Sequence, residues 1–265
     1  MNYTILIGNS AGSSGTTLSE LSSPTSMCYD RSQRAIIIGD RANYRIIKFS
    51  LDNLSANGTI LAGGNNAGCS NNQFLRIEGV AIDSARQLYV IDFDCKRLMK
   101  FPANSNSATS GQVIASMNQP QAITIDQQTD DVYVADSGDH LVMKFTNSDS
   151  QGVIVAGNER IFFLFFSQMQ LFNLGGNGWG SNLNQFTNIL GIYFDYALYV
   201  SDCYNHRVLK FPANSTNGTF GTLVAGNGVS GSGANQISNA EGITVDENGV
   251  LYIADAGILN IEKKC

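Results

Sequence analysis

An internal repeat constrains this chain of 265 residues more than any other feature of its sequence. The segment 202–211, Asp-Cys-Tyr-Asn-His-Arg-Val-Leu-Lys-Phe, recurs in related form at 40–49, 92–101 and 136–145, and in a more divergent form at 255–264. The aspartates that open these copies are separated by 52, 44, 66 and 53 residues. A sequence period of this length indicates a repeat architecture, in which each copy folds as one supersecondary unit.

Each copy belongs to a unit with four short apolar segments, which in the fourth unit are residues 191–194, 197–200, 207–211 and 222–225. These segments are rich in β-branched and aromatic residues, and Asp, Asn or Gly bounds them. No stretch shows a sustained helical period, so the segments are predicted as strands. Four antiparallel strands repeated about every 50 residues are typical of a β-propeller blade, so the predicted fold class is all-β.

The strand count predicts a single propeller of five four-stranded blades over residues 1–265. The first three strands occur five times, whereas the fourth follows only four of the units. The missing strand is predicted at residues 3–8, which resemble the fourth strand at 222–226, so that the N-terminal strand closes the last blade and removes exposed strand edges. A fragment of a six-bladed ring is the alternative. The repeats are predicted at residues 24–63, 77–116, 119–157, 188–226 and 239–265.

Residues 158–175 interrupt this pattern. Without them, residues 176–186 would continue directly from Gly157 and match residues 64–74. The 18 extra residues carry an apolar run at 161–166 that is unlike any other loop of the chain. The codons of Gly157 and Asn158 can supply a GT, and those of Leu174 and Gly175 can supply TTAG, as the two ends of an intron require. We interpret the segment as an insertion or a translated intron. The alternative is a real apolar loop that docks on a membrane or a partner.

The repeated pattern resembles the NHL-repeat family, which is named for an Asn-His-Leu triplet at the turn between the second and third strands. The triplet stands here as Asn-His-Arg at 205–207, Asp-His-Leu at 139–141 and Asn-Tyr-Arg at 43–45, whereas the last unit has Ile-Leu-Asn at 258–260. The surrounding patterns (Gly-Ile-x-Val-Asp, Leu-Tyr-Val-x-Asp, Arg-Val-x-Lys-Phe and Leu-Val-Ala-Gly) resemble the family over nearly the whole chain. This resemblance implies a propeller scaffold that binds other molecules.

Composition limits the class of partner. The net charge of −6 and the pI of about 4.8 argue against nucleic acid as a partner. The longest apolar run, at 161–166, is too short to span a bilayer, so no membrane span is predicted. The start of the sequence shows no signal peptide. We expect a monomeric propeller, either alone or as part of a longer chain.

Glycosylation sequons give the one indication of compartment. They occur at five positions, and all but the first fall in predicted loops between third and fourth strands: Asn2, Asn53, Asn57, Asn214 and Asn217. Glycans there would leave the opposite loop face free, which favours an extracellular setting. The sequence leaves the pairing of the five cysteines open, and it contains no Cys-x-x-Cys motif.

The titratable residues that recur in phase with the repeat are interpreted as structural. His140 and His206 occupy the same repeat position, and two phased histidines cannot supply a three-ligand catalytic zinc site. The paired aspartates of every unit are expected to brace turns by accepting backbone N–H bonds. We therefore predict no catalytic residue and no bound cofactor, and we expect the chain not to be an enzyme.

Two glutamates break the repeat. Glu78 and Glu241 each precede a glycine at the start of a first strand, where other units have Gln121 and Leu190. Gluconolactonase-like propellers are similar in placing a metal-binding glutamate before a glycine at this position. The resemblance makes both residues candidate calcium ligands, since calcium prefers oxygen donors. The alternative is that both are solvated turn residues.

Three aromatic residues also break the repeat. Trp179, the only tryptophan, lies in a Gly-rich loop between blades, and Phe93 and Tyr204 lie in loops between second and third strands. In a propeller both kinds of loop emerge on one face. Exposed aromatic side chains there suit contact with a peptide or a sugar, because they bury a large area at low entropic cost. The alternative is that Trp179 covers its own blade.

These observations predict a non-enzymatic recognition scaffold whose loop face binds a peptide, a protein or a glycan. Family resemblance gives one alternative, the substrate- or RNA-recognition part of a tripartite-motif-like ubiquitin ligase. The glutamates give another, a calcium-dependent lactonase-like hydrolase.

Overall fold

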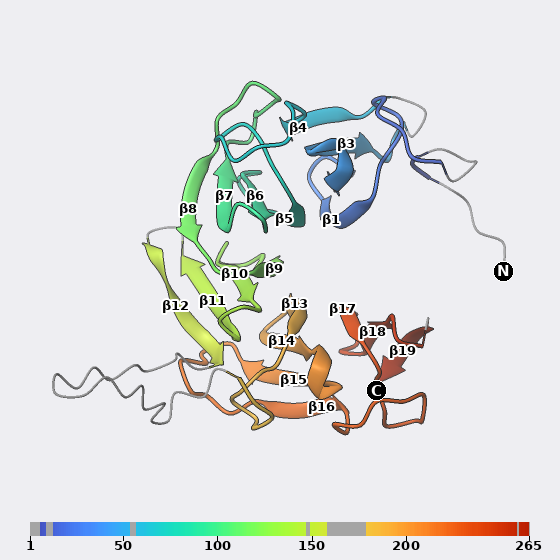
Figure 1. The fold of residues 1–265 in the computed structure, drawn as a ribbon, viewed down its shortest axis with the longest axis vertical. Helices are drawn as coiled ribbons and strands as arrows, with labels where there is room; N and C mark the ends of the chain where they lie inside the picture. Colours follow the sequence, from blue (N-terminus) through green and yellow to red (C-terminus); the bar gives the residue numbers. More distant parts are fainter. Residues whose placement is uncertain are drawn as a thin grey trace, which may run out of the picture. The chain divides into compact units, whose positions relative to one another are not determined.

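The computed structural model describes residues 6–8, 13–53, 57–146, 149–157, 179–258 and 260–264. They divide into two compact units, Met1–Pro120 and Gln121–Cys265, here called unit 1 and unit 2. The described residues form five antiparallel sheets in sequence order, four with four strands and one with three (Figure 1). Repeated four-stranded antiparallel sheets are the blades of a β-propeller. The predicted all-β propeller class is therefore confirmed.

Unit 1 contains the first two sheets. The first is built from β1 (Pro24–Asp30), β2 (Ala35–Asp40), β3 (Arg45–Ser50) and β4 (Thr59–Gly63), with the short 3-10 helix η1 (Arg41–Asn43) between β2 and β3. The second is built from β5 (Ile77–Ile82), β6 (Leu88–Asp92), β7 (Arg97–Phe101) and β8 (Gln112–Ser116). The inner strands β1 and β5 contact each other.

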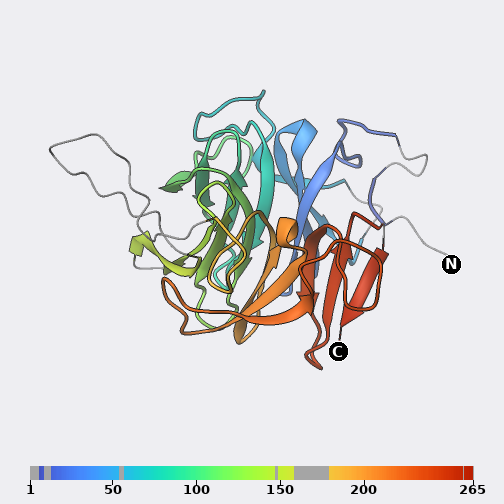
Figure 2. The same cartoon turned by 60° about the horizontal axis from the view of Figure 1, so that its bottom comes forward.

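Unit 2 contains the other three sheets, which Figure 2 shows from a second direction. The third sheet has β9 (Pro120–Ile125), β10 (Val132–Asp136), β11 (Leu141–Thr146) and β12 (Asp149–Gly157). The fourth has β13 (Ile189–Phe194), β14 (Ala197–Asp202), η2 (Cys203–Asn205), β15 (Arg207–Pro212) and β16 (Thr222–Gly226). The fifth has β17 (Ala240–Val245), β18 (Leu251–Asp255) and β19 (Asn260–Lys264).

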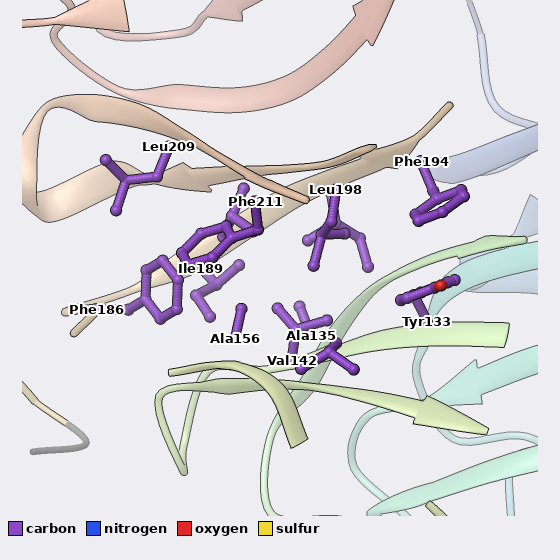
Figure 3. Packing of buried hydrophobic residues seen from close by; sticks show 13 residues of the cluster. Tyr133, Ala135, Val142, Ala156, Phe186, Ile189, Phe194, Leu198, Leu209 and Phe211 are labelled. Atoms are coloured by element: carbon purple, nitrogen blue, oxygen red, sulfur yellow. The ribbon is translucent and has the colours of Figure 1, made fainter. Parts of the chain in front are cut away.

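Within each unit, the core lies between the faces of successive sheets. In unit 2, Tyr133 of β10 stacks on Phe194 of β13 with ring centroids 4.5 Å apart, and Phe186 and Phe211 lie 5.8 Å apart in the same cluster (Figure 3). The second strands are fully buried at their centres, as at Val200. Successive side chains of a strand point to opposite faces of its sheet. Both faces are covered at the second strands, so almost every residue of these strands is apolar.

The turn between the second and third strands has one backbone conformation in four of the sheets. The residue before the third strand has a positive φ of 50° to 59° at Tyr44, Lys96, His140 and His206. This left-handed conformation closes the turn and is uncommon for residues other than glycine. The two histidines are thus turn residues, as their phased recurrence predicts.

Two sequence-based predictions fall largely outside the described residues. The predicted closing strand at 3–8 is described only from Leu6 to Gly8, and these three residues are not in a strand. Ile7 packs instead against the apolar side chains of Ile38, Ile47 and Phe49 in the first sheet. The segment 158–175 lies wholly outside the described residues.

Candidate functional site

The aspartates that open each repeat are buried at the ends of the second strands. Asp40, Asp92, Asp136, Asp202 and Asp255 have exposed fractions of 0 to 2 %. Their carboxylates accept backbone N–H bonds from nearby loops, for example from Ser22 to Asp40 at 2.6 Å. A buried carboxylate must be paired or hydrogen-bonded, because burial removes its hydration. The predicted turn-bracing role of these aspartates is confirmed.

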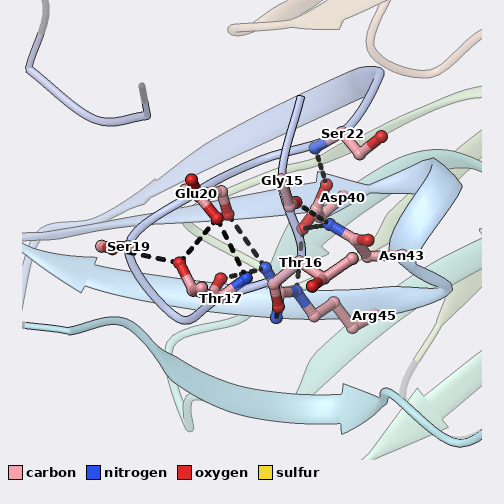
Figure 4. Close-up of polar contacts among 9 residues, drawn as sticks. All are labelled: Gly15, Thr16, Thr17, Ser19, Glu20, Ser22, Asp40, Asn43 and Arg45. Carbon is pink, nitrogen blue, oxygen red and sulfur yellow. Dashed lines mark hydrogen bonds and ion pairs between the residues drawn. The ribbon is translucent and has the colours of Figure 1, made fainter. Parts of the chain in front are cut away.

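In three of the sheets an arginine joins this aspartate to the preceding loop. In the first sheet, Arg45 Nε donates to Asp40 Oδ2 at 2.8 Å (Figure 4). The terminal nitrogens of Arg45 donate to the carbonyl oxygens of Thr16, Thr17 and Glu20 at 2.8 to 3.0 Å. The planar guanidinium fits this fork of acceptors, and the loop is thereby fixed to the blade.

The same arrangement occurs at Arg97 and Arg207. Arg97 contacts Asp92 and the carbonyl oxygens of Cys69, Ser70 and Gln73. Arg207 contacts Asp202 and the carbonyl oxygens of Ser181, Asn182 and Gln185. Burial raises the pKa of Asp202 above its usual value, and the bond from Thr187 and the charge of Arg207 oppose that shift. The loop that follows Trp179 is therefore anchored to its blade.

The structure brings Trp179 and Tyr204 to adjoining loops of unit 2. Trp179 is 65 % exposed and Tyr204 is 64 % exposed. Asn205 Nδ2, directly after Tyr204, donates to the carbonyl oxygen of Gly180, directly after Trp179, at 2.8 Å. Trp179 also forms a parallel bridge with the fully buried Phe186. The tryptophan is thus held at its backbone while its side chain faces solvent.

An exposed carboxylate lies near Cys203, the residue that precedes Tyr204. Glu241 Oε1 accepts a 2.9 Å hydrogen bond from Asn239 Nδ2, and Asn239 Oδ1 contacts the thiol of Cys203, which precedes Tyr204. Burial raises the pKa of Cys203 to about 11, and the nearby charge of Glu241 adds to the shift. Glu241 is thus connected through Asn239 to the start of the loop that carries Tyr204.

Phe93 has a different setting and belongs to unit 1. Its ring lies under the guanidinium of Arg76, with Cζ 4.4 Å from the ring centroid. Arg76 stands where other units have Asn188 and Asn239, and this departure from the repeat is the sequence signal for the contact. The phenylalanine ring is half-buried under this cation.

Glu78 and Glu241 lie in different units and have different partners. Glu78 Oε1 pairs with Arg76 at 2.5 Å and with Arg41 at 3.3 Å, and its side chain is only 13 % exposed. Two guanidinium groups on one carboxylate oppose the binding of a cation there. In the part of the chain that the structure describes, no group of three or more His, Cys, Asp and Glu residues is arranged to hold a metal ion.

A disulfide closes the loop before the second sheet. Cys69 is bonded to Cys95 in the turn between β6 and β7, and the two residues are 26 positions apart in sequence. Cys28 and Cys203 are free thiols. The sequence left this pairing open. Disulfides persist in oxidising compartments and are rare in the reduced cytosol.

Comparison with known proteins identifies the repeat. The family model described as "NHL repeat" matches residues 117–145. The chain contains an NHL repeat. This match confirms the resemblance that the phased triplets predict. Among curated proteins, no sequence matches the chain significantly. An NHL repeat suggests, in general, a protein-binding scaffold.

Solved structures are similar to this chain in fold. An auxiliary nutrient binding protein from Bacteroides thetaiotaomicron matches with a TM-score of 0.65 and 14 % identity, over 92 % of this chain and 59 % of that protein. A nidogen/laminin complex matches with a TM-score of 0.64 and 15 % identity, over 92 % of this chain and 76 % of the matched one. This NHL-repeat chain therefore spans less than two thirds of the first of these proteins. No helix among the described residues is long and apolar enough to cross a membrane.

Proposed function

We propose that this NHL-repeat chain is a recognition module whose loops around Trp179 and Tyr204 bind a polypeptide segment of a partner protein. The observation that carries the proposal is the pair of exposed aromatic side chains on loops joined by the bond from Asn205 to Gly180. Large aromatic residues on a rigid support bury much area on binding while losing little conformational entropy.

The charge at this surface supports a basic segment as the ligand. Glu241 is exposed, and Asn239 and Cys203 connect it to the loop of Tyr204. A lysine or arginine of the ligand could pair with this carboxylate while its aliphatic stem packs on an aromatic ring. Complementary charge at a rim chiefly sets specificity and the association rate.

The disulfide supports a setting outside the cytosol. Cys69–Cys95 is compatible with a secretory or extracellular compartment. The sequon residues Asn53, Asn57, Asn214 and Asn217 are all exposed, as an acceptor of a glycan must be. An extracellular binding partner is favoured over a ubiquitin ligase substrate, which would meet the chain in a reducing compartment.

Binding to immobilised peptide and glycan arrays tests the proposal. We expect the protein to select basic peptides, and we expect Trp179→Ala and Tyr204→Ala each to weaken binding about tenfold or more. Tyr196→Ala is the matched control, because Tyr196 is 74 % exposed in the turn between β13 and β14, at the opposite end of the same sheet. Equal affinity of all three variants would exclude the aromatic pair as the binding site. Selection of glycans alone would show that the ligand is a glycan and not a peptide.

A further inference from the structure

Three loops in the described part of the chain are built around an arginine. In each, a glycine N–H donates to the carbonyl oxygen six residues later, as from Gly180 to Phe186 at 3.1 Å. Within the loop, Gln185 N–H donates to Asn182 at 3.0 Å, and Gln185 Oε1 accepts from Asn182 N–H at 3.1 Å. These bonds turn three carbonyl oxygens toward the guanidinium of Arg207, which completes the arrangement.

The fifth sheet has the loop and the aspartate but lacks the arginine. Gln236 N–H donates to Gly233 at 2.9 Å, and Gln236 Oε1 accepts from Gly233 N–H at 3.0 Å, as in the fourth sheet. In the register of β18 and β19, Asp255 pairs with Asn260, where Asp202 pairs with Arg207. An asparagine is about three bonds shorter than an arginine and carries no charge, so it cannot supply a guanidinium to this loop.

Among the residues whose side chains the structure describes, the buried carboxylate of this sheet has no cationic partner. Asp255 is 1 % exposed and accepts backbone N–H bonds from Ser238 and Asn239 at 2.7 Å and from Gly257 at 3.1 Å. Within the described ranges, no ion pair involves Asp255, whereas Asp40, Asp92 and Asp202 each pair with an arginine. A buried negative charge without a counterion favours the binding of a cation.

The loop of the fifth sheet is also more open to solvent. Asn235 is exposed and Gln236 is half-buried, whereas their counterparts Asn184 and Gln185 in the fourth sheet are buried. A ligand can therefore reach the carbonyl oxygens that correspond to those of Ser181, Asn182 and Gln185. We name residues 232–236 together with Asp255 the vacant arginine cradle.

We propose that the vacant arginine cradle binds a guanidinium group, presented by an arginine side chain of a partner protein. The three occupied copies show that this combination of carbonyl oxygens and a carboxylate fits a planar fork of N–H donors. A lysine ammonium is a compact point charge with three donors and does not match that fork. The proposal rests on these loops alone and is independent of the aromatic pair.

Thermal unfolding with small cations tests the cradle. N-acetyl-arginine amide represents an arginine in a polypeptide, free arginine represents a small-molecule source, and N-acetyl-lysine amide controls for charge. At concentrations well above its dissociation constant, we expect the blocked arginine to raise the Tm by about 3 °C and the lysine derivative to have no effect. A response to free arginine but not to the blocked form would overturn the assignment to a protein side chain.

Two variants make the test specific. Asn260→Arg places a tethered guanidinium in the cradle, so we expect a higher Tm and no further response to the arginine derivative. Arg207→Ala empties the equivalent cradle of the fourth sheet, so its Tm should fall and its response to the derivative should grow. A wild-type protein that does not respond, or an Asn260→Arg variant that responds as the wild type does, would show that the cradle does not bind guanidinium.

Discussion

Asn205 donates a 2.8 Å hydrogen bond to the carbonyl oxygen of Gly180, and this bond joins the loops of Trp179 and Tyr204. The same amide nitrogen donates to Asp202 at 2.8 Å, so the pair of loops is tied to a buried residue of the blade. Binding that depends on both aromatic rings needs the two loops to keep this spacing.

Replacing Asn205 with alanine should weaken ligand binding without removing either ring. We expect the affinity for the selected peptide to fall about 3- to 30-fold, because the loops lose the bond that fixes their separation. Surface plasmon resonance with the immobilised peptide measures this loss. Asn214→Ala, an exposed change between β15 and β16, is the control. Unaltered affinity of Asn205→Ala would mean that the bond plays no part in recognition.

Arg207→Ala should destabilise unit 2 strongly. The substitution removes the cation beside buried Asp202 and leaves three loop carbonyl oxygens without their donor. Breaking a buried ion pair on one side costs about 3–5 kcal/mol. Urea denaturation followed by circular dichroism gives the free energy of unfolding. Lys210→Ala is the matched control, because it also removes a cation from β15 but at an exposed position. Its Nζ lies 5.1 Å from the ring centroid of Tyr199. A loss of less than about 1 kcal/mol in the free energy of unfolding would contradict the role of Arg207 in fixing the loop to the blade.

Cys28 and Cys203, the free thiols among the described residues, should be unreactive in the folded protein at pH 8. Burial raises the pKa of Cys28 to about 12 and that of Cys203 to about 11. Since the thiolate is the reactive form, only about one Cys203 in a thousand would be ionised at pH 8. Iodoacetamide labelling with peptide mass spectrometry should find both sites unmodified until a denaturant is added. Labelling of either residue in the native protein at the rate of an unfolded control would contradict the burial.

The same shifts give the protein a defined pH dependence. Both thiols ionise less readily in the folded state than at the ordinary value of 9.0. The folded state therefore binds more protons, and the stability contributed by the neutral thiols is full below pH 9 and is lost as pH rises through about 11 to 12.

The disulfide should stabilise unit 1. A cross-link between residues 26 positions apart restricts the unfolded chain, and a loop of this length contributes about 3 kcal/mol. We expect the double variant Cys69→Ala/Cys95→Ala to have a free energy of unfolding lower by that amount, and therefore to unfold at a lower denaturant concentration. The double variant should not respond to a reducing agent, whereas the wild type should approach its stability after reduction. An equal midpoint for wild type and double variant would show that the cross-link contributes nothing.

Features that recur with the repeat could be predicted from sequence, and features that depend on contacts between loops could not. The buried aspartates and the turn histidines were visible because each position repeats in phase. The three carbonyl oxygens around Arg207 were not, because backbone acceptors have no sequence signature. The pairing of Cys69 with Cys95 and the proximity of Trp179 to Tyr204 depend on how loops 25 or more residues apart are folded.

Deleting residues 1–8 tests the closing strand that the repeat predicts. The fifth sheet has three strands in the described part of the chain, and the sequence 3–8 resembles the fourth strand of another unit. We expect the deletion to lower the Tm by more than 10 °C, since an exposed strand edge and an uncovered apolar face are both costly. Deletion of residues 158–175 is the control. Without those residues the sequence continues the repeat directly, so that variant should keep a Tm close to that of the wild type. A stable protein lacking residues 1–8 would show that another segment completes the fifth blade, as in a six-bladed propeller.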